Sequence, residues 1–239
     1  MIRASIFASA LAAAAMACVF SLNACARTPA PDASIRLAAA PAMAAAIGDW
    51  QVGTNYTLLE QPQTPGAAKG KVEVNEIFWY GCSHCYALDP TLESWKVSKP
   101  AYIEFARIPV VWGPVHRQHA KLFYTIQALK RPDLHTKIFD AIHRDGNPLS
   151  AETDEDARAM QLEFLRANGV SEKDFNAAYD SMPVAMNVSH AQDLTAIFAV
   201  ASVPLIIVNG KFSTGVGPAG GPSQLLSLIN DLAASEKAR

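Results

Sequence analysis

The chain has 239 residues, of which 50% are hydrophobic and 18% charged, and its formal net charge is −2 with an isoelectric point near 6.3. A chain so close to neutrality offers no strongly basic surface, so we expect no nucleic-acid partner. Its length suits one sizeable domain, or a domain that carries an insertion.

The first predicted element is an export signal over residues 1–25. Arg3 supplies its positive start, and residues 6–22 form an apolar run that is short for a membrane span. The run ends in Leu-Asn-Ala-Cys, which resembles the lipobox of bacterial lipoproteins, so Cys25 is predicted to carry a lipid anchor. Ordinary signal cleavage nearby, which would leave Cys25 as an unpaired thiol, stays open. Residues 26–48 are rich in Ala and Pro, which favours a tether.

Two strands are predicted at the start of the folded body. Residues 50–59 (WQVGTNYTLL) are expected to form the first, and a turn rich in Pro and Gly follows over residues 62–70. Residues 71–80 (KVEVNEIFWY) are rich in β-branched and aromatic side chains and predict the second strand, which Gly81 ends.

Cys82 and Cys85 form a Cys-x-x-Cys pair where the second strand meets a predicted helix. Apolar residues recur every three to four positions over residues 83–96, so Cys82 is expected at a helix N-terminus. Unpaired N–H groups and the helix dipole stabilise a thiolate there. His84 adds a hydrogen bond or a positive charge. The pattern indicates thiol-disulfide chemistry with Cys82 as the reactive sulfur.

Two other interpretations of these cysteines are weaker. A structural disulfide would close only a tiny loop and add little stability. A zinc site needs about four ligands, and no second Cys-x-x-Cys completes one; His116 and His119 are of a kind that more often packs or faces solvent. We therefore predict no metal. An exported chain also meets an oxidising compartment.

Glu76 interrupts the apolar pattern of the second strand. It lies two residues after Val74 and so on the same side of the strand, which predicts a buried carboxyl. Such a carboxyl could move a proton for Cys85. The alternatives are a carboxylate that escapes to solvent, or one that simply pairs with Arg107 on the neighbouring predicted strand.

The rest of the body alternates between strands and helices. The predicted elements are a strand at 102–111, an almost wholly helical stretch at 115–194, a strand at 204–208, a hairpin turn at Asn209-Gly210 into a strand at 211–214, a flexible connection at 215–222 and a last helix at 224–235.

From about residue 50 onward, the chain resembles the DsbA family of bacterial thiol-disulfide oxidoreductases. Three motifs carry the resemblance: residues 82–86 (CSHCY), the Val203-Pro204 pair and residues 207–212 (IVNGKF). One departure is Ser83, where the best-known members have proline, and residues between the cysteines tune the stability of the thiolate.

The fold that this resemblance implies is an α/β fold, a thioredoxin fold with an inserted α-helical domain. Residues 49–112 and 195–239 would form the thioredoxin-like domain, and residues 113–194 the helical insert. The resemblance also implies a cis Val203–Pro204 peptide bond opposite the cysteines, with the backbone of Val203 free to pair with a substrate peptide. A trans proline that opens a strand is the alternative.

The function we expect is donation of the Cys82–Cys85 disulfide to exported proteins that carry free cysteines. The resemblance implies a periplasmic location, a strongly oxidising couple and reoxidation by a membrane partner of the DsbB kind. The enzyme alternative is a reductase or isomerase that uses the same residues. The non-enzyme alternative is a holdase or binding module with incidental cysteines. We expect a monomer without a cofactor.

Overall fold

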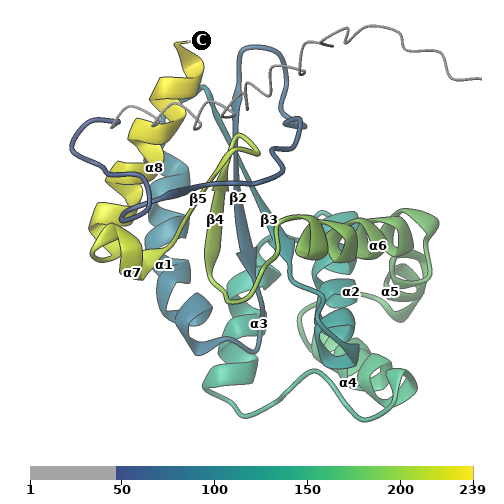
Figure 1. Cartoon of the computed structure of the whole chain (residues 1–239). Coiled ribbons are helices and arrows are strands. Elements are labelled where there is room, and N and C mark those ends of the chain that lie inside the picture. Colours follow the sequence, from purple (N-terminus) through teal and green to yellow (C-terminus); the bar gives the residue numbers. More distant parts are fainter. Residues whose placement is uncertain (1–46, 239) are drawn as a thin grey trace, which may run out of the picture. The chain divides into compact units, whose positions relative to one another are not determined.

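A computed structural model gives the structure of the chain and describes residues 47–238 (Figure 1). Within this range five strands form one sheet in the spatial order β1-β5-β4-β2-β3. They are β1 (Thr57–Leu58), β2 (Val72–Phe78), β3 (Ile103–Pro109), β4 (Leu205–Val208) and β5 (Phe212–Thr214). β2 and β3 run parallel, and the other neighbouring strands run antiparallel. The carboxyl ends of β2 and β3 therefore meet at one edge of the sheet.

Eight helices accompany the sheet in the described part of the chain. They are α1 (Ser83–Ser98), α2 (Pro114–Ala128), α3 (Leu134–His143), α4 (Asp154–Ala167), α5 (Glu172–Tyr179), α6 (Met182–Ile197), α7 (Val216–Ala219) and α8 (Pro222–Lys237). Helices α2 to α6 lie between β3 and β4 in the chain (Figure 1). The predicted fold class, a thioredoxin fold with a helical insertion, is confirmed.

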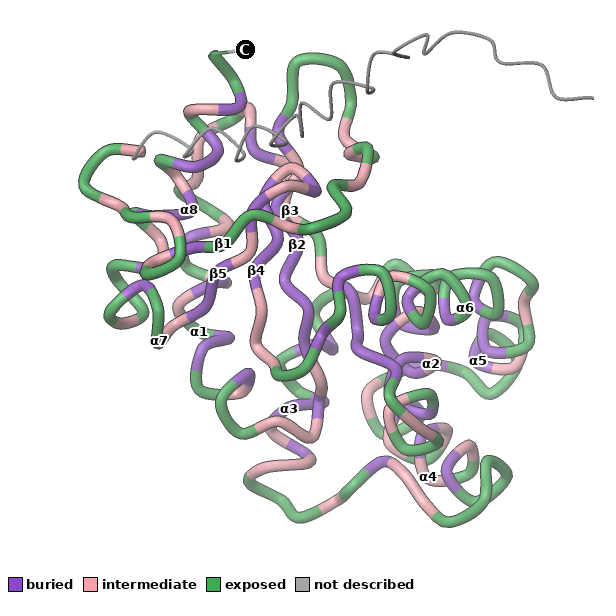
Figure 2. The backbone as a smooth tube through the Cα atoms, in the orientation of Figure 1, coloured by how far each residue is buried: buried purple, intermediate pink, exposed green. Residues whose placement is uncertain are grey.

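The interior strand β2, which lies between β4 and β3, is buried on both faces (Figure 2). On one face, Val74 packs in a core with Leu92 of α1 and Leu228 of α8, all at 0% exposure. On the other face, Ile77 belongs to a core that includes Val188 of α6. Burial of each such side chain contributes about 1.5–3 kcal/mol, which explains why this apolar strand lies inside the sheet and not at its edge.

The hairpin predicted at Asn209 and Gly210 is confirmed. Both residues have positive φ, 52° and 63°, as a two-residue turn of type I′ requires. Gly210 is also required for space, because a Cβ there would lie 2.3 Å from the backbone oxygen of Gln63. The turn pairs β4 with β5 and so holds the segment that starts at Pro204 in the sheet.

Two local predictions are wrong. Within residues 50–59 only Thr57 and Leu58 form a strand, because Gly53 (φ +80°) starts a turn in which its N–H binds the oxygen of Tyr56 at 2.7 Å. The predicted flexible connection at residues 215–222 contains the short helix α7. Turn geometry overrides the β-forming composition of the first segment.

No helix within residues 47–238 is both long and apolar enough to cross a membrane. The predicted export signal, most of the tether and Cys25 lie outside the described residues.

Candidate active site

Cys82 is the N-cap residue of α1. Its backbone is extended (φ −89°, ψ 115°), and its Sγ accepts the backbone N–H of Cys85 at 3.4 Å. The N–H of Cys82 binds the oxygen of Trp79 at 3.0 Å, which closes a tight turn between β2 and α1. Both cysteines are free thiols, with Cys82 half-buried and Cys85 fully buried. An attacking thiolate can therefore reach Cys82, whereas Cys85 is shielded.

The two sulfurs have opposite acidities. A hydrogen bond from the Cys85 thiol lowers the pKa of Cys82 to about 6, although burial acts in the other direction. The backbone N–H groups of Cys85 and His84 and the charge of the exposed His84 side chain add smaller lowering contributions. Burial raises the pKa of Cys85, and its hydrogen bond to Cys82 raises it further. The dithiol thus holds one thiolate at neutral pH and one thiol.

The Val203–Pro204 peptide bond is cis, as the resemblance implies. Pro204 directly precedes β4, and Sγ of Cys82 lies 3.4 Å from the oxygen of Val203, to which it donates a hydrogen bond when it is protonated. The structure therefore brings the predicted substrate-binding pair against the reactive sulfur.

Glu76 is buried, as predicted, with 1% of its surface exposed. It stands opposite Arg107 in the register of β2 and β3, and its Oε2 accepts the Nε–H of Arg107 at 2.7 Å. Burial raises the pKa of Glu76 to about 7 even though the charge of Arg107 lowers it. The charge of Glu76 also acts on Cys85 and raises the pKa of that thiol. Burial and pairing with Arg107 thus occur together.

Arg107 is shared by three carboxylates. Its Nη2 lies 2.8 Å from Asp89 and its Nη1 lies 2.6 Å from Glu93, in addition to the bond to Glu76. Asp89 and Glu93 are not among the site residues predicted from the sequence. They follow Cys85 at intervals of four residues in α1, which places all three on one face of the helix, and this spacing is the signal that would have found them.

Among the buried carboxyls of this cluster, Glu76 is the one whose pKa is raised. For Asp89, burial acts to raise the pKa, but hydrogen bonds from His135 and Thr136 and the charge of Arg107 outweigh it and lower the pKa. His135 Nε2 lies 3.3 Å from Asp89 Oδ1, and Thr136 Oγ1 lies 3.0 Å from Oδ2. Because Asp89 has these further donors, Glu76 is the carboxyl that burial leaves closest to neutrality.

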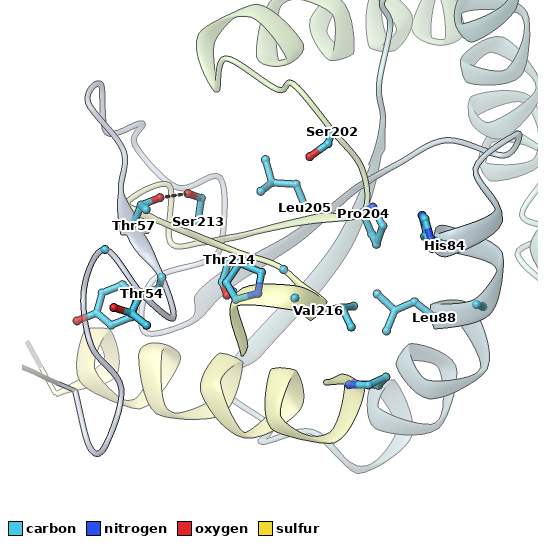
Figure 3. Close-up of a pocket in the computed structure, with 17 residues that line it drawn as sticks. Thr54, Thr57, His84, Leu88, Ser202, Pro204, Leu205, Ser213, Thr214 and Val216 are labelled. Carbon is cyan, nitrogen blue, oxygen red and sulfur yellow. Dashed lines mark hydrogen bonds between the residues drawn. The ribbon is translucent and has the colours of Figure 1, made fainter. Parts of the chain in front are cut away.

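A cavity of about 610 Å³ opens beside His84, the residue that directly precedes Cys85 (Figure 3). His84 and Leu88 of α1 lie on one side of it, and Pro204, Leu205 and Val216 also line it. None of the described residues that line it is Asp, Glu, Lys or Arg, and the lining includes several Gly, Ser and Thr residues. His84 is thus the only titratable group other than Tyr56 in the described lining of this cavity.

His116 and His119 pack around Trp79. The Nε1–H of Trp79 donates to Nδ1 of His119 at 2.9 Å, and Nε2 of His119 donates to the oxygen of Pro148 at 2.9 Å. The ring of His116 lies 4.5 Å from that of Trp79. Within residues 47–238 no cluster of three or more His, Cys, Asp or Glu side chains is arranged to hold a metal ion.

A strand, a Cys-x-x-Cys at a helix N-cap and a facing cis-proline on this fold define a thiol-disulfide oxidoreductase of the thioredoxin-like class. A thiol:disulfide interchange protein DsbA from Pseudomonas aeruginosa is 35% identical over 207 residues, which cover 86% of this chain and 95% of that protein. The chain belongs to the DsbA family.

Further comparisons agree with this assignment. A DsbA from Azotobacter vinelandii is 37% identical over 190 residues, which cover 79% of this chain and 86% of that protein. The crystal structure of Pseudomonas aeruginosa DsbA superposes with a TM-score of 0.73 at 34% identity, over 80% of this chain and 96% of that one. A search of protein-family models found no match.

Proposed function

We propose that this chain oxidises exported proteins by donating its Cys82–Cys85 disulfide. The observation that supports this direction best is the unequal environment of the two sulfurs, with Cys82 accessible and stabilised as a thiolate. A stabilised thiolate favours the dithiol form, so the disulfide form is a strong oxidant.

The exchange takes place in two steps. A substrate thiolate attacks Sγ of Cys82, the Cys82–Cys85 bond breaks, and Cys85 leaves with the electron pair while a mixed disulfide forms. A second thiolate of the substrate then attacks the substrate sulfur of that mixed disulfide. Cys82 leaves as its stabilised thiolate, the substrate gains one disulfide, and the enzyme is left as the dithiol.

Glu76 supplies the proton for Cys85 in the first step. Burial raises the pKa of Cys85, so this sulfur leaves most readily when a proton reaches it. Glu76 has a pKa of about 7 and therefore carries a proton in a large share of molecules at neutral pH. His84 acts at the other sulfur, where its charge favours the thiolate of Cys82.

The substrate peptide lies across Val203 and Pro204. The oxygen of Val203 already faces the sulfur of Cys82, so an extended substrate backbone at this place would present its own cysteine to Cys82. The cavity beside Pro204, which no Asp, Glu, Lys or Arg among the described residues lines, takes the apolar side chains that an unfolded chain exposes. Binding there needs no particular sequence, which suits a donor with many substrates.

The redox equilibrium with glutathione tests the direction of transfer. We expect the Cys82–Cys85 pair to remain largely reduced in glutathione mixtures that keep ordinary structural disulfides oxidised, as read by the mass change on thiol alkylation. If mildly oxidising glutathione mixtures instead oxidise the pair, Ser83 has lowered the reduction potential of the Cys82–Cys85 disulfide. The reductase or isomerase alternative then replaces the oxidase.

The acidity of Cys82 predicts how stability depends on pH. In the unfolded chain the thiol has its ordinary pKa of 9.0, and in the folded dithiol the pKa is about 6. Between these values the unfolded state binds more protons, so the stability of the dithiol form rises with pH and is lost as pH falls through about 6. Urea midpoints at both ends of this range measure it. The disulfide form is the control, because it lacks the titrating thiol and should not show this rise.

The proposed location of the protein in the cell is inferred from its N-terminal residues. Residues 1–25 act as an export signal, Cys25 carries the lipid, and residues 26–48 tether a monomeric catalytic body in the periplasm, where a DsbB-like membrane protein reoxidises it. The Ala- and Pro-rich composition of residues 26–48 supports the tether.

Replacement of Cys25 by serine tests the lipid anchor. Because the lipid is the attachment, the Cys25→Ser protein is expected in the soluble periplasmic fraction and the unchanged protein in the membrane fraction, as measured by fractionation and immunoblotting. If the wild-type protein is itself found in the soluble periplasmic fraction, the signal is removed without lipidation of Cys25.

A further inference from the structure

Helix α3 of the insert contacts the chain on both sides of the Cys-x-x-Cys pair. Before the pair, Nε2 of His143 donates to the backbone oxygen of Tyr80 at 2.8 Å. After the pair, the ring of Tyr86 stacks on the ring of His143, with centroids 4.8 Å apart and planes 6° apart. The Tyr86 hydroxyl also donates to Oδ1 of Asp140, one turn earlier in α3, at 2.8 Å. His143 thus contacts both flanks of the motif.

The carbonyl that His143 binds lies in the middle of a tight turn. The N–H of Cys82 binds the oxygen of Trp79, so Tyr80 and Gly81 are the two central residues of a four-residue turn. The two common forms of such a β-turn are type I, the first form, and type II, the second form. They differ in the direction of the central carbonyl, which here belongs to Tyr80. The second form needs positive φ at Gly81, which Gly81 does not have. The turn is therefore not of the second form, and the Tyr80 oxygen is directed at His143.

Sterics at Gly81 do not select this form. A residue with a Cβ at position 81 would resist positive φ, whereas glycine adopts both forms of the turn with ease. Glycine is required for another reason, since a Cβ would lie 2.4 Å from the indole ring of Trp79. The indole ring of Trp79 therefore leaves room only for glycine at position 81. Glycine would allow the Tyr80–Gly81 peptide to rotate between the two turn forms, and the hydrogen bond from His143 opposes that rotation.

We propose that His143 is a positioning residue that holds the Tyr80–Gly81 peptide and thereby sets the acidity of Cys82. The inference rests on the proposed function, in which that acidity makes the disulfide a strong oxidant. Rotation of this peptide would change the direction in which the chain enters Cys82. The bond from the Cys85 N–H to the Cys82 sulfur, 3.4 Å long, depends on the extended backbone of Cys82 at the N-cap.

The two contacts of His143 can be removed one at a time. His143→Phe keeps an aromatic ring against Tyr86 and loses the donor to Tyr80, whereas His143→Gln keeps an N–H donor at a similar reach and loses the ring. His190→Phe makes the first substitution at an exposed position of α6 and serves as the matched control.

For His143→Phe we expect a rise in the pKa of Cys82 by about half a unit to one unit, since one net hydrogen bond is worth about threefold to tenfold in an equilibrium. The glutathione equilibrium should move by about the same factor toward the disulfide. His143→Gln and His190→Phe should stay close to the unchanged protein. The pKa is read from the ultraviolet absorbance of the thiolate, and thermal unfolding of each disulfide form records any general loss of stability.

An unchanged Cys82 pKa in His143→Phe overturns the inference, and so does an equal shift in His143→Gln, because the shift would then not follow the loss of the donor to Tyr80. The proposed function fails on a different result, namely a reducing couple in the unchanged protein. The Cys82 pKa in the His143 variants tests the inference whether the Cys82–Cys85 pair of the wild-type protein is oxidising or reducing.

Discussion

Replacement of Cys82 by alanine is expected to abolish disulfide donation, with a loss of at least about 10³-fold in the rate at which a reduced two-cysteine peptide is oxidised. In the proposed mechanism the substrate attacks the half-buried but accessible sulfur of Cys82, and Cys85 cannot take its place because it is fully buried and its raised pKa keeps it a thiol. The measurement is the initial rate of peptide oxidation, followed by loss of free thiols with oxidised glutathione as the final oxidant.

Cys85→Ala is the matched control for this variant. It retains the accessible Cys82 and is expected to accumulate mixed disulfides with substrates, visible as bands that a reductant removes. A holdase with incidental cysteines predicts something else: both variants would suppress aggregation of an unfolded client as well as the unchanged protein does. Full oxidase activity in Cys82→Ala would contradict the mechanism outright.

Replacement of Arg107 by methionine is expected to lower the free energy of unfolding by about 3–5 kcal/mol. Arg107 is the cation that Glu76, Asp89 and Glu93 share, and the side chains of Glu76 and Asp89 are each only 2% exposed. Without the guanidinium, two buried carboxylates lose their charge partner. The measurement is urea unfolding of the disulfide form near neutral pH.

Lower pH should reduce the deficit of Arg107→Met. Carboxyls without a cation have folded pKa values raised above their unfolded values, so the folded state binds more protons and the loss of stability shrinks as pH falls. A deficit that is small near neutral pH, or that does not change with pH, would show that the cluster is more solvated than its burial indicates.

Glu76→Gln is the companion variant. It removes one carboxylate from a set of three that shares one cation, and the amide oxygen still accepts the Nε–H of Arg107, so stability should change by about 1 kcal/mol or less. Its effect should appear in the chemistry instead. Because Glu76 has a pKa of about 7, formation of the mixed disulfide should lose its dependence on pH around that value.

The parts of the fold that sequence predicts well are those that local patterns determine. The buried strand β2, the helix after Cys82 and the Asn209-Gly210 turn each carry their own signal, in β-branched composition, helical periodicity and turn chemistry. The strand expected at residues 50–59 fails because a glycine turn competes with a β-forming composition, and the composition alone does not show which of them prevails.

The parts of the site that sequence does not predict depend on partners that are distant in the chain. In the sequence, Asp89 cannot be distinguished from an ordinary solvent-facing helix carboxylate, because its partner Arg107 lies in the sheet. His135 contacts Asp89 from α3, and no local sequence pattern predicts that α3 packs against α1. His143 acquires its contact with Tyr80 in the same way, through the packing of α3 beside the active-site turn. Glu76 was predictable because its own strand determines which way it points.

The position of the insert between β3 and β4 has a consequence for the order of folding. β2 pairs with β3 nearby in the chain, but its other neighbour is β4, so that Val74 pairs with Val208 only after the whole insert has been made. Contacts of such sequence separation form late. Pro204 and Val203 belong to that last segment. We therefore expect a chain whose C-terminal segment has not yet joined the sheet to carry Cys82 and Cys85 as ordinary thiols, and to become an oxidant only when that segment is in place.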